Sequence, residues 1–378
     1  MKFCSRVSFT FATGAVGALI WMSCALGQSE KVQLDNIIKN LEGVRTLLED
    51  QRAQKNIQGE EIPSATQTRV TEEAANQIAR IAQQLSRAAG GGMNAKAIYG
   101  QDDRRNYNLV TPSQKLAADT TVILVKSSVV SIAPDGKTFD LPGGNILDSV
   151  TGTGLCTPAQ AAENKEPEEP FYNEPNPGFC SGFRVSKNHI LTAGHCIQTD
   201  ADCKSTRFVF GFYATSAHPE KAIPITQMYS CKKVINGTLT GNGPDWRLVE
   251  TDRDMTFGSD APLRTATTLP KLAQGDGVTV VGYPLGLPVK IAAGATVRGF
   301  GSGFFVANLD TYEGNSGSAV FNNDSMSRGQ LIVEGILVRG ENDFDITKPC
   351  FASKRCPSNG CRGEDVTLAT EAKSGPPN

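Results

Sequence analysis

The sequence predicts an all-β fold of two antiparallel β-barrels, preceded by an N-terminal α-helical hairpin. Two observations support this prediction. Apolar residues early in the chain recur at helical spacing, whereas short β-rich runs separated by turn signals lie on both sides of residue 250. Three consecutive glycines, at positions 90–92, separate the two patterns and have the composition of a flexible joint. We therefore expect a domain boundary at that point.

The first 27 residues have the layout of a secretory signal. Basic residues precede an apolar run from Val7 to Met22, and small residues precede Gln28. The run is short for a membrane span, which makes an uncleaved anchor the weaker alternative. We expect residues 1–27 to be removed after Gly27, which leaves a secreted or periplasmic protein with no stable membrane insertion.

Two helical stripes follow the signal. Apolar residues recur every three or four positions from Leu34 to Leu48, and again from Ala74 to Ala88. Pro63 breaks the pattern between them, and Thr71 with the acidic residues after it has the chemistry of a helix start. We predict a helical hairpin within residues 28–92. The sequence leaves open whether this hairpin is a pro-segment that is removed from a zymogen, or a retained domain that acts intramolecularly or in self-association.

Length and charge restrict the class of partner. The chain has 378 residues, which is long enough for two cores, and its 39% hydrophobic and 20% charged residues are ordinary for a globular protein. A net charge of -2 gives no support for nucleic-acid binding, because phosphate recognition needs a basic excess. Polypeptides are the expected partners.

The cysteines fit an exported protein. Ten are present, and the eight that lie beyond residue 27 are an even number, as four disulfides require. Zinc is the alternative for Cys350, Cys356 and Cys361, but their spacings of six and five residues, with no histidine nearby, suit a zinc site poorly. We expect no metal and no other cofactor.

The β-rich part of the chain is interrupted by one long irregular stretch. Runs such as 120–125, 208–212 and 278–281 have the composition of strands. Residues 133–178 instead contain turn signals and an acidic, proline-broken segment, so we predict that they are loop-like and bury little.

Three sequence blocks supply the groups that peptide-bond hydrolysis needs. His195 follows the apolar run 190–192, Asp245 leads into a second apolar run, and Ser316 lies in the segment Gly-Asn-Ser-Gly-Ser that begins at residue 314. A hydroxyl becomes nucleophilic at neutral pH when an imidazole accepts its proton and a carboxylate orients that imidazole. We predict that His195, Asp245 and Ser316 form a catalytic triad.

The serine block also supplies hydrogen-bond donors. We expect the backbone N–H groups of Gly314 and Ser316 to form an oxyanion hole. A glycine at 314 permits the unusual backbone geometry that aims both donors at one point. Each donor in such a hole contributes about 3 kcal/mol to stabilisation of the transition state.

On these blocks, the chain from about Ile98 to its C-terminus resembles the bacterial branch of trypsin-like serine proteases that includes the glutamyl endopeptidases. The segment Ile98–Arg104 resembles the start of the mature domain in that branch, and Val281-Gly282-Tyr283-Pro284 is similar to its second-barrel segment. The resemblance implies a protease domain at 98–378 built from two six-stranded antiparallel barrels of the chymotrypsin type. It also implies a disulfide between Cys180 and Cys196.

The chain departs from animal trypsins at the residue before the serine. In those enzymes a new N-terminal ammonium pairs with an aspartate at that position, but this chain has Asn315 there. An amide cannot form that ion pair. If the segment from Gly92 to Ile98 is cut during maturation, activation must therefore work through another contact.

A second departure concerns specificity. Leu337 stands where glutamyl endopeptidases have a histidine, whereas Asp310 lies six residues before Ser316, the spacing at which trypsins place the aspartate of their specificity pocket. A buried carboxylate there would select arginine or lysine. We expect Gly340 to leave the pocket mouth open, and the backbone of Leu337 and Val338 to pair with an extended substrate.

The leading hypothesis is therefore an exported serine endopeptidase that forms an acyl-enzyme and prefers Arg or Lys before the scissile bond. The alternative is a catalytically inactive secreted protein that uses the same scaffold for binding. The complete set of triad residues argues against the alternative, because a binding module has no physical need for all three.

Overall fold

The computed structural model describes residues 96–144, 155–166, 168–215, 218–219, 221–345 and 351–372. All of them belong to the second of two compact units into which the chain divides, Gly92–Asn378. The expected signal, 1–27, and the expected helical hairpin, 28–92, lie outside the described residues.

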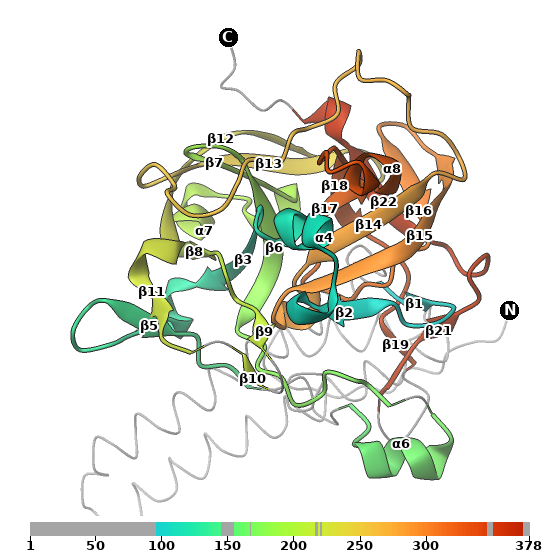
Figure 1. The fold of residues 1–378 in the computed structure, drawn as a ribbon, viewed down its shortest axis with the longest axis horizontal. Helices are drawn as coiled ribbons and strands as arrows, with labels where there is room; N and C mark the ends of the chain where they lie inside the picture. Colours follow the sequence, from blue (N-terminus) through green and yellow to red (C-terminus); the bar gives the residue numbers. More distant parts are fainter. Residues whose placement is uncertain are drawn as a thin grey trace, which may run out of the picture. The chain divides into compact units, whose positions relative to one another are not determined.

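The N-terminal half of this unit forms a closed, six-stranded antiparallel barrel (Figure 1). Around the barrel the strand order is β12-β13-β7-β6-β3-β8. In chain order these strands are β3 (Thr121–Lys126), β6 (Gly178–Ser186), β7 (His189–Thr192), β8 (Thr206–Val209), β12 (Met228–Leu239) and β13 (Asp245–Thr251).

The C-terminal half forms a second closed barrel, drawn mainly in orange and red in Figure 1. Its order is β14-β17-β18-β22-β16-β15, closed by pairing of β14 with β15, and β2 (Arg104–Asn106) adds a seventh strand beside β15. The six barrel strands are β14 (Gly277–Gly282), β15 (Lys290–Phe300), β16 (Phe304–Ala307), β17 (Ala319–Asn322), β18 (Val333–Arg339) and β22 (Glu364–Leu368). The predicted pair of six-stranded antiparallel barrels is confirmed.

Local sequence explains the central strands. Five consecutive residues of β3, Thr121–Val125, are buried, and this β-branched and aliphatic run pairs with β6 on one side and β8 on the other. Strands β6 and β7 form a hairpin across the two-residue turn Lys187–Asn188. The hairpin is important for function because β7 leads directly to His195.

Shorter strands lie outside the barrels. β1 pairs in parallel with β21, and Figure 1 shows the two side by side. Two further pairs are β9 with β10 and β19 with β20, while β5 lies between β4 and β11. Their bounds are β1 (Ile98–Tyr99), β4 (Ser131–Ile132), β5 (Thr138–Asp140), β9 (Ala214–Thr215), β10 (His218–Pro219), β11 (Ile223–Pro224), β19 (Phe344–Asp345), β20 (Ala352–Ser353) and β21 (Arg355–Cys356).

Helices are few and short in the described part of the chain. They are α4 (Pro112–Ala118), α6 (Pro158–Asn164), α7 (Asp200–Lys204) and α8 (Asn323–Ser327). In α4 and α6 a threonine N-cap, Thr111 or Thr157, exchanges hydrogen bonds with a glutamine three residues later, which is a capping box. α6 corrects the prediction of a wholly loop-like stretch at 133–178, because that capping box starts a helix within it.

Three disulfides are present among the described residues, and two of them lie in the first barrel. They join Cys180 to Cys196, Cys203 to Cys231, and Cys356 to Cys361. Cys156 is also disulfide-bonded. The bond between Cys356 and Cys361 removes both from the zinc alternative. Among the described residues, no helix has the length and apolar character that a membrane crossing requires.

Candidate active site

His195 is positioned by the pairing of two strands. It lies in the 3₁₀ turn η3 (Gly194–Cys196), just after β7, and the neighbouring strand β13 begins at Asp245. β13 runs antiparallel to β7 with Arg247 opposite Thr192. Asp245 comes two residues before Arg247, and Gly194 comes two residues after Thr192. The antiparallel register therefore places Asp245 against the turn that carries His195.

The Asp245 carboxylate holds both the ring and the backbone of the histidine turn. Its Oδ2 lies 2.7 Å from His195 Nδ1, and its Oδ1 accepts hydrogen bonds from the N–H groups of Gly194 at 2.5 Å and His195 at 3.2 Å. Asp245 is 3% exposed. A buried carboxylate in this position fixes the imidazole with Nδ1 as the donor and leaves Nε2 free to accept a proton.

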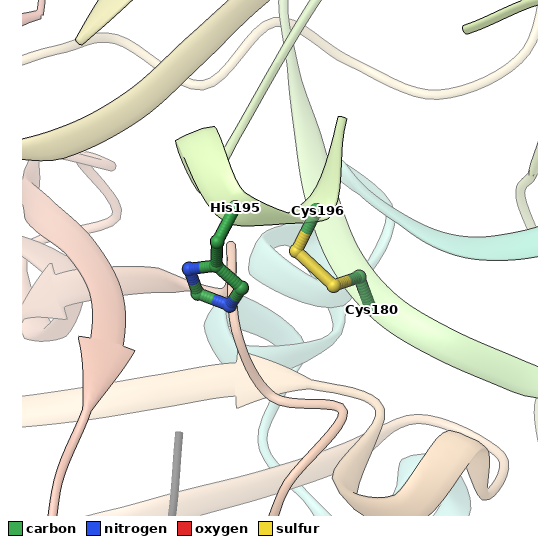
Figure 2. Close-up of side chains that lie close together, drawn as sticks. All are labelled: Cys180, His195 and Cys196. Carbon is green, nitrogen blue, oxygen red and sulfur yellow. A yellow bond between two sulfur atoms is a disulfide. The ribbon is translucent and has the colours of Figure 1, made fainter. Parts of the chain in front are cut away.

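The Cys180–Cys196 disulfide lies next to the imidazole. Figure 2 shows His195 and Cys196 extending from the same short turn, with Cys180 reaching the bond from a neighbouring strand. One ligand-type atom from each of these three residues lies within 4.8 Å of the others, but the two sulfurs are bonded to each other and offer no thiolate to a metal. The disulfide thus anchors the histidine turn to β6.

Ser316 lies in a tight turn between β16 and β17 and is 2% exposed. The turn is held from both barrels. The Ser316 carbonyl accepts a hydrogen bond at 2.8 Å from the N–H of Ser181, in the first barrel. The N–H of the next residue, Gly317, donates to Leu337 O, in the second barrel, at 2.7 Å. The two neighbouring glycines have left-handed backbones, with φ of 89° at both Gly314 and Gly317, which side chains rarely tolerate.

The two predicted oxyanion donors have no other partner in the described structure. Neither Gly314 N nor Ser316 N donates a hydrogen bond to another described residue. The Gly314 carbonyl is fixed by Ser181 Oγ at 2.8 Å, which sets the orientation of that peptide.

The Ser316 hydroxyl has an unexpected partner. Lys96 Nζ donates a hydrogen bond to Ser316 Oγ at 2.9 Å, and Oγ in turn lies 3.4 Å from the Val338 carbonyl, to which it donates. Lys96 has no exposed surface. No hydrogen bond joins Ser316 Oγ to His195 among the described contacts, so the lysine ammonium is the group that lies against the hydroxyl.

Buried carboxylates surround Lys96. Its backbone N–H donates to Asp343 Oδ1, and the N–H of Ala97 donates to Glu364 Oε1 at 3.3 Å. Burial raises the pKa of Asp343 to about 7 and lifts the pKa of Glu364 well above its usual range. Burial lowers the pKa of Lys96, and the negative charges of Glu364, Asp343 and Glu313 oppose that effect.

Asp310 contacts the N-terminal segment of the described chain. It accepts hydrogen bonds from Tyr99 N at 2.6 Å and Asp103 N at 2.8 Å. Burial and the nearby Asp103 carboxylate raise the pKa of Asp310 to about 8. Both side chains line a cavity of about 350 Å³ that does not include Ser316 among its lining residues.

The other predicted specificity residues lie near Ser316. Leu337 and Val338 belong to β18, which pairs with the strand that follows Ser316. Gly340 comes directly after β18, and a Cβ at this position would collide with the Glu364 carboxylate. Space at Gly340 is therefore occupied by an acidic side chain from β22.

Sequence reasoning missed Lys96, Asp343 and Glu364. None belongs to a motif, and Lys96 reaches Ser316 because the adjoining strand β1 is held against β21. Arg339, which follows Val338, faces a different way: its Nε lies 3.0 Å from Asp365 Oδ2. Two adjacent acidic residues, 364 and 365, stand in an otherwise strand-like run, and this pattern was the one signal in the sequence that could have indicated a buried carboxylate.

Part of the chain matches a known protein family. Residues 180–331 match the family model of the trypsin-like peptidase domain, a segment that contains all three predicted triad positions. A solved structure described as a Glu endopeptidase in complex with MPD is similar over 72% of this chain and 95% of that chain, with 15% sequence identity and a TM-score of 0.38. No curated protein matches the chain.

The family match covers β6, β7 and the histidine turn, and it continues through the Ser316 loop to the start of the last pair of barrel strands. Most strands of the two closed barrels, from β6 to β17, belong to that segment. Residues 180–331 therefore carry a trypsin-like peptidase domain, set within a fold of two closed antiparallel barrels.

Proposed function

We propose that this protease is exported and hydrolyses polypeptides through an acyl-enzyme on Ser316. His195 acts as general base and then as general acid, and Asp245 orients it. The backbone N–H groups of Gly314 and Ser316 form the oxyanion hole. The side chain before the scissile bond is arginine or lysine.

The observation that carries this proposal is the set of hydrogen bonds around Asp245. One carboxylate oxygen binds His195 Nδ1 at 2.7 Å while the other binds two backbone N–H groups of the same turn. A carboxylate used only to end a turn would not need to contact the imidazole. A carboxylate against Nδ1 favours the tautomer that a general base requires, which supports this role for His195.

The chemistry follows from these groups. Ser316 Oγ attacks the carbonyl carbon of the substrate as His195 Nε2 takes its proton, and the tetrahedral oxyanion is stabilised by the two backbone donors. The C–N bond then breaks, and the imidazolium gives its proton to the leaving amine. Water, deprotonated by His195, attacks the ester carbon, the acyl C–O bond breaks, and the imidazolium returns the proton to Ser316 Oγ, which releases the acid and the free serine. The proton balance closes without a metal or cofactor.

His195 and the serine turn adjoin one disulfide. A ring nitrogen of His195 lies within 4.8 Å of the Cys180–Cys196 sulfurs, and Cys196 Sγ lies 3.6 Å from the Ser316 carbonyl oxygen. This shared neighbour supports a contact between the His195 imidazole and the Ser316 hydroxyl. The mechanism needs that contact, which forms once Lys96 no longer lies against Oγ.

Export is supported by the disulfides, because such bonds persist in oxidising compartments and are rare in the cytosol. The signal-like layout of residues 1–27 agrees with this. The preference for arginine or lysine is supported by the acidic surroundings of the nucleophile, where Glu364 and Asp343 are both buried.

A fluorophosphonate probe tests the chemistry, because it reacts with an activated serine irrespective of side-chain specificity. Covalent labelling of Ser316 in the secreted protein, lost in Ser316→Ala, is the expected result. Labelling that persists in Ser316→Ala would assign the activity to another residue. Peptide-library cleavage by the labelling-competent form then reports specificity, and cleavage mainly after glutamate would contradict the proposed preference.

A further inference from the structure

The contact between Lys96 and Ser316 is the feature that the peptidase mechanism does not use. The lysine is 0% exposed, so its side chain fills space next to the nucleophile and excludes other molecules from it. Its ammonium donates to Oγ at 2.9 Å. A substrate must place its carbonyl and the side chain before the scissile bond in this same neighbourhood.

Backbone contacts hold the lysine there. Lys96 N donates to Asp343, Ala97 N donates to Glu364 at 3.3 Å, and Ala97 O accepts from Thr311 N at 3.2 Å. The next residues form β1 and pair with β21. Lys96 is thus the end of an anchored strand rather than a side chain that happens to fall into a cavity.

Two buried acidic residues, Asp343 and Glu364, lie beside Lys96. Glu364 exerts the largest charge effect on Lys96, followed by Asp343. Glu364 also fills the space at Gly340, beside the β18 segment expected to bind substrate. A cation that replaces Lys96 would meet the same two buried acidic groups, and a cationic partner stabilises the ionised form of a buried carboxyl.

We propose that Lys96 is an intramolecular inhibitor: it occupies the subsite for a cationic substrate side chain and blocks Ser316 until it is displaced or removed. Asp343 and Glu364 are the specificity-determining residues of that subsite. The proposal rests on the peptidase function proposed above and adds to it the determinants of specificity and a mode of regulation.

A rival role for Lys96 is general base for Ser316, as a lysine so close to a hydroxyl can be. In the structure Lys96 Nζ donates to Ser316 Oγ and Oγ donates to the Val338 carbonyl, whereas a general base would accept the hydroxyl proton. The imidazole of His195, fixed by Asp245, is already available for that task. The two roles predict opposite effects of removing the lysine side chain.

The first experiment compares fluorophosphonate labelling of the intact full chain with that of its Lys96→Ala variant, with mass spectrometry to confirm that each is uncut. We expect Ser316 to be labelled at least tenfold faster in Lys96→Ala. Lys187→Ala is the matched control, because Lys187 is 71% exposed and pairs only with Asp254 on the surface. It should label at the wild-type rate.

Equal labelling rates in the wild type and Lys96→Ala would overturn the inhibitor proposal while leaving the peptidase function intact. Loss of labelling in a folded Lys96→Ala chain would assign Lys96 the base role instead. Should Lys96→Ala fail to fold because it leaves carboxylates unpaired, Lys96→Ala/Asp343→Asn restores the charge balance and is measured in its place. No labelling of any folded form would overturn the proposed function itself.

The second experiment tests specificity in the Lys96→Ala chain with matched peptides that carry lysine, leucine or glutamate before the scissile bond. Glu364→Gln and Asp343→Asn should each lower kcat/KM for the lysine peptide at least tenfold relative to the leucine peptide. Fluorophosphonate labelling counts the reactive serines in each variant, so that kcat/KM is expressed per labelled site.

Asp310 is the competing candidate for the carboxylate of the cationic subsite, and Asp310→Asn tests it in the same assay. If it removes the preference for lysine while Glu364→Gln and Asp343→Asn do not, the cationic subsite lies at Asp310 and the proposal is wrong. A ratio of lysine to leucine hydrolysis that is the same in all three variants would also overturn it.

Discussion

Asp310 accepts a hydrogen bond from the N–H of Tyr99 at 2.6 Å, across 211 positions of sequence. This contact ties the loop before the nucleophile to the first described strand, β1. The N-terminal part of the protease unit is therefore an integral part of the structure around the serine, and its charged residues affect stability as well as the site.

Stability should fall as the pH rises from about 4 to 8, partly because of Asp310. Its pKa is raised from 3.8 to about 8 in the folded chain by burial and by Asp103. The folded state therefore holds a proton that the unfolded state releases over this range, so raising the pH favours unfolding, with no further effect above the folded pKa. Urea unfolding of the Ser316→Ala chain at several pH values measures the slope.

Asp310→Asn mimics the protonated carboxyl and should make that slope shallower. Asp135→Asn is the control, because Asp135 is exposed and should leave the slope as it is. An unchanged slope in Asp310→Asn would mean that Asp310 ionises in the folded chain at the same pH as in the unfolded one.

Asp245→Asn should lower kcat about 10⁴-fold, as removing this carboxylate does in enzymes with a His-Asp-Ser triad. The amide keeps the size of the side chain but no longer enforces a donor at His195 Nδ1. Circular dichroism should be unchanged. Asp252→Asn, at the other end of β13 and exposed, is the control and should retain its activity.

Removing the Cys180–Cys196 disulfide by a double serine substitution should lower the free energy of unfolding by about 3 kcal/mol, given a loop closed over 16 residues. It should also reduce activity, because the bond anchors the histidine turn. The disulfide between Cys356 and Cys361 closes only five residues, and its loss should cost about 2 kcal/mol. Denaturant titration of both variants makes the comparison.

Gly317→Ala should be severely destabilising. Its φ of 89° is unfavourable for alanine, and a Cβ would collide with the Ser181 carbonyl and Thr192 Oγ1. Gly329→Ala separates the two causes, because Gly329 has a φ of 74° with open space around it. We expect a loss of about 1 kcal/mol at Gly329 from backbone strain alone, and a several-fold larger loss at Gly317. Similar losses would show that the turn can relax around the new methyl group.

The sequence predicted those parts of the molecule that depend on local pattern. The two barrels follow from runs such as β3, and the Cys180–Cys196 bond follows from the resemblance. The capping box at Thr157 was also readable from sequence, but the proline-rich and acidic composition around it favoured a loop.

The electrostatics of the site could not be predicted in this way. The spacing of Asp310 from Ser316 says nothing about which segment packs against Asp310. In the structure that segment contains Tyr99, over 200 positions away in the sequence. Lys96, Asp343 and Glu364 meet only because β1, the β18 edge and β22 converge in three dimensions. Such long-range contacts leave no periodic or spaced signature in one sequence.

Ser181 links the two halves of the protease unit: its N–H binds the Ser316 carbonyl and its Oγ binds the Gly314 carbonyl, both at 2.8 Å. One residue of the first barrel thus holds the backbone of the Ser316 turn in the second. Hinge-like separation of the halves would therefore break the nucleophile's support before either core melted, and inactivation should precede or coincide with global unfolding rather than follow it.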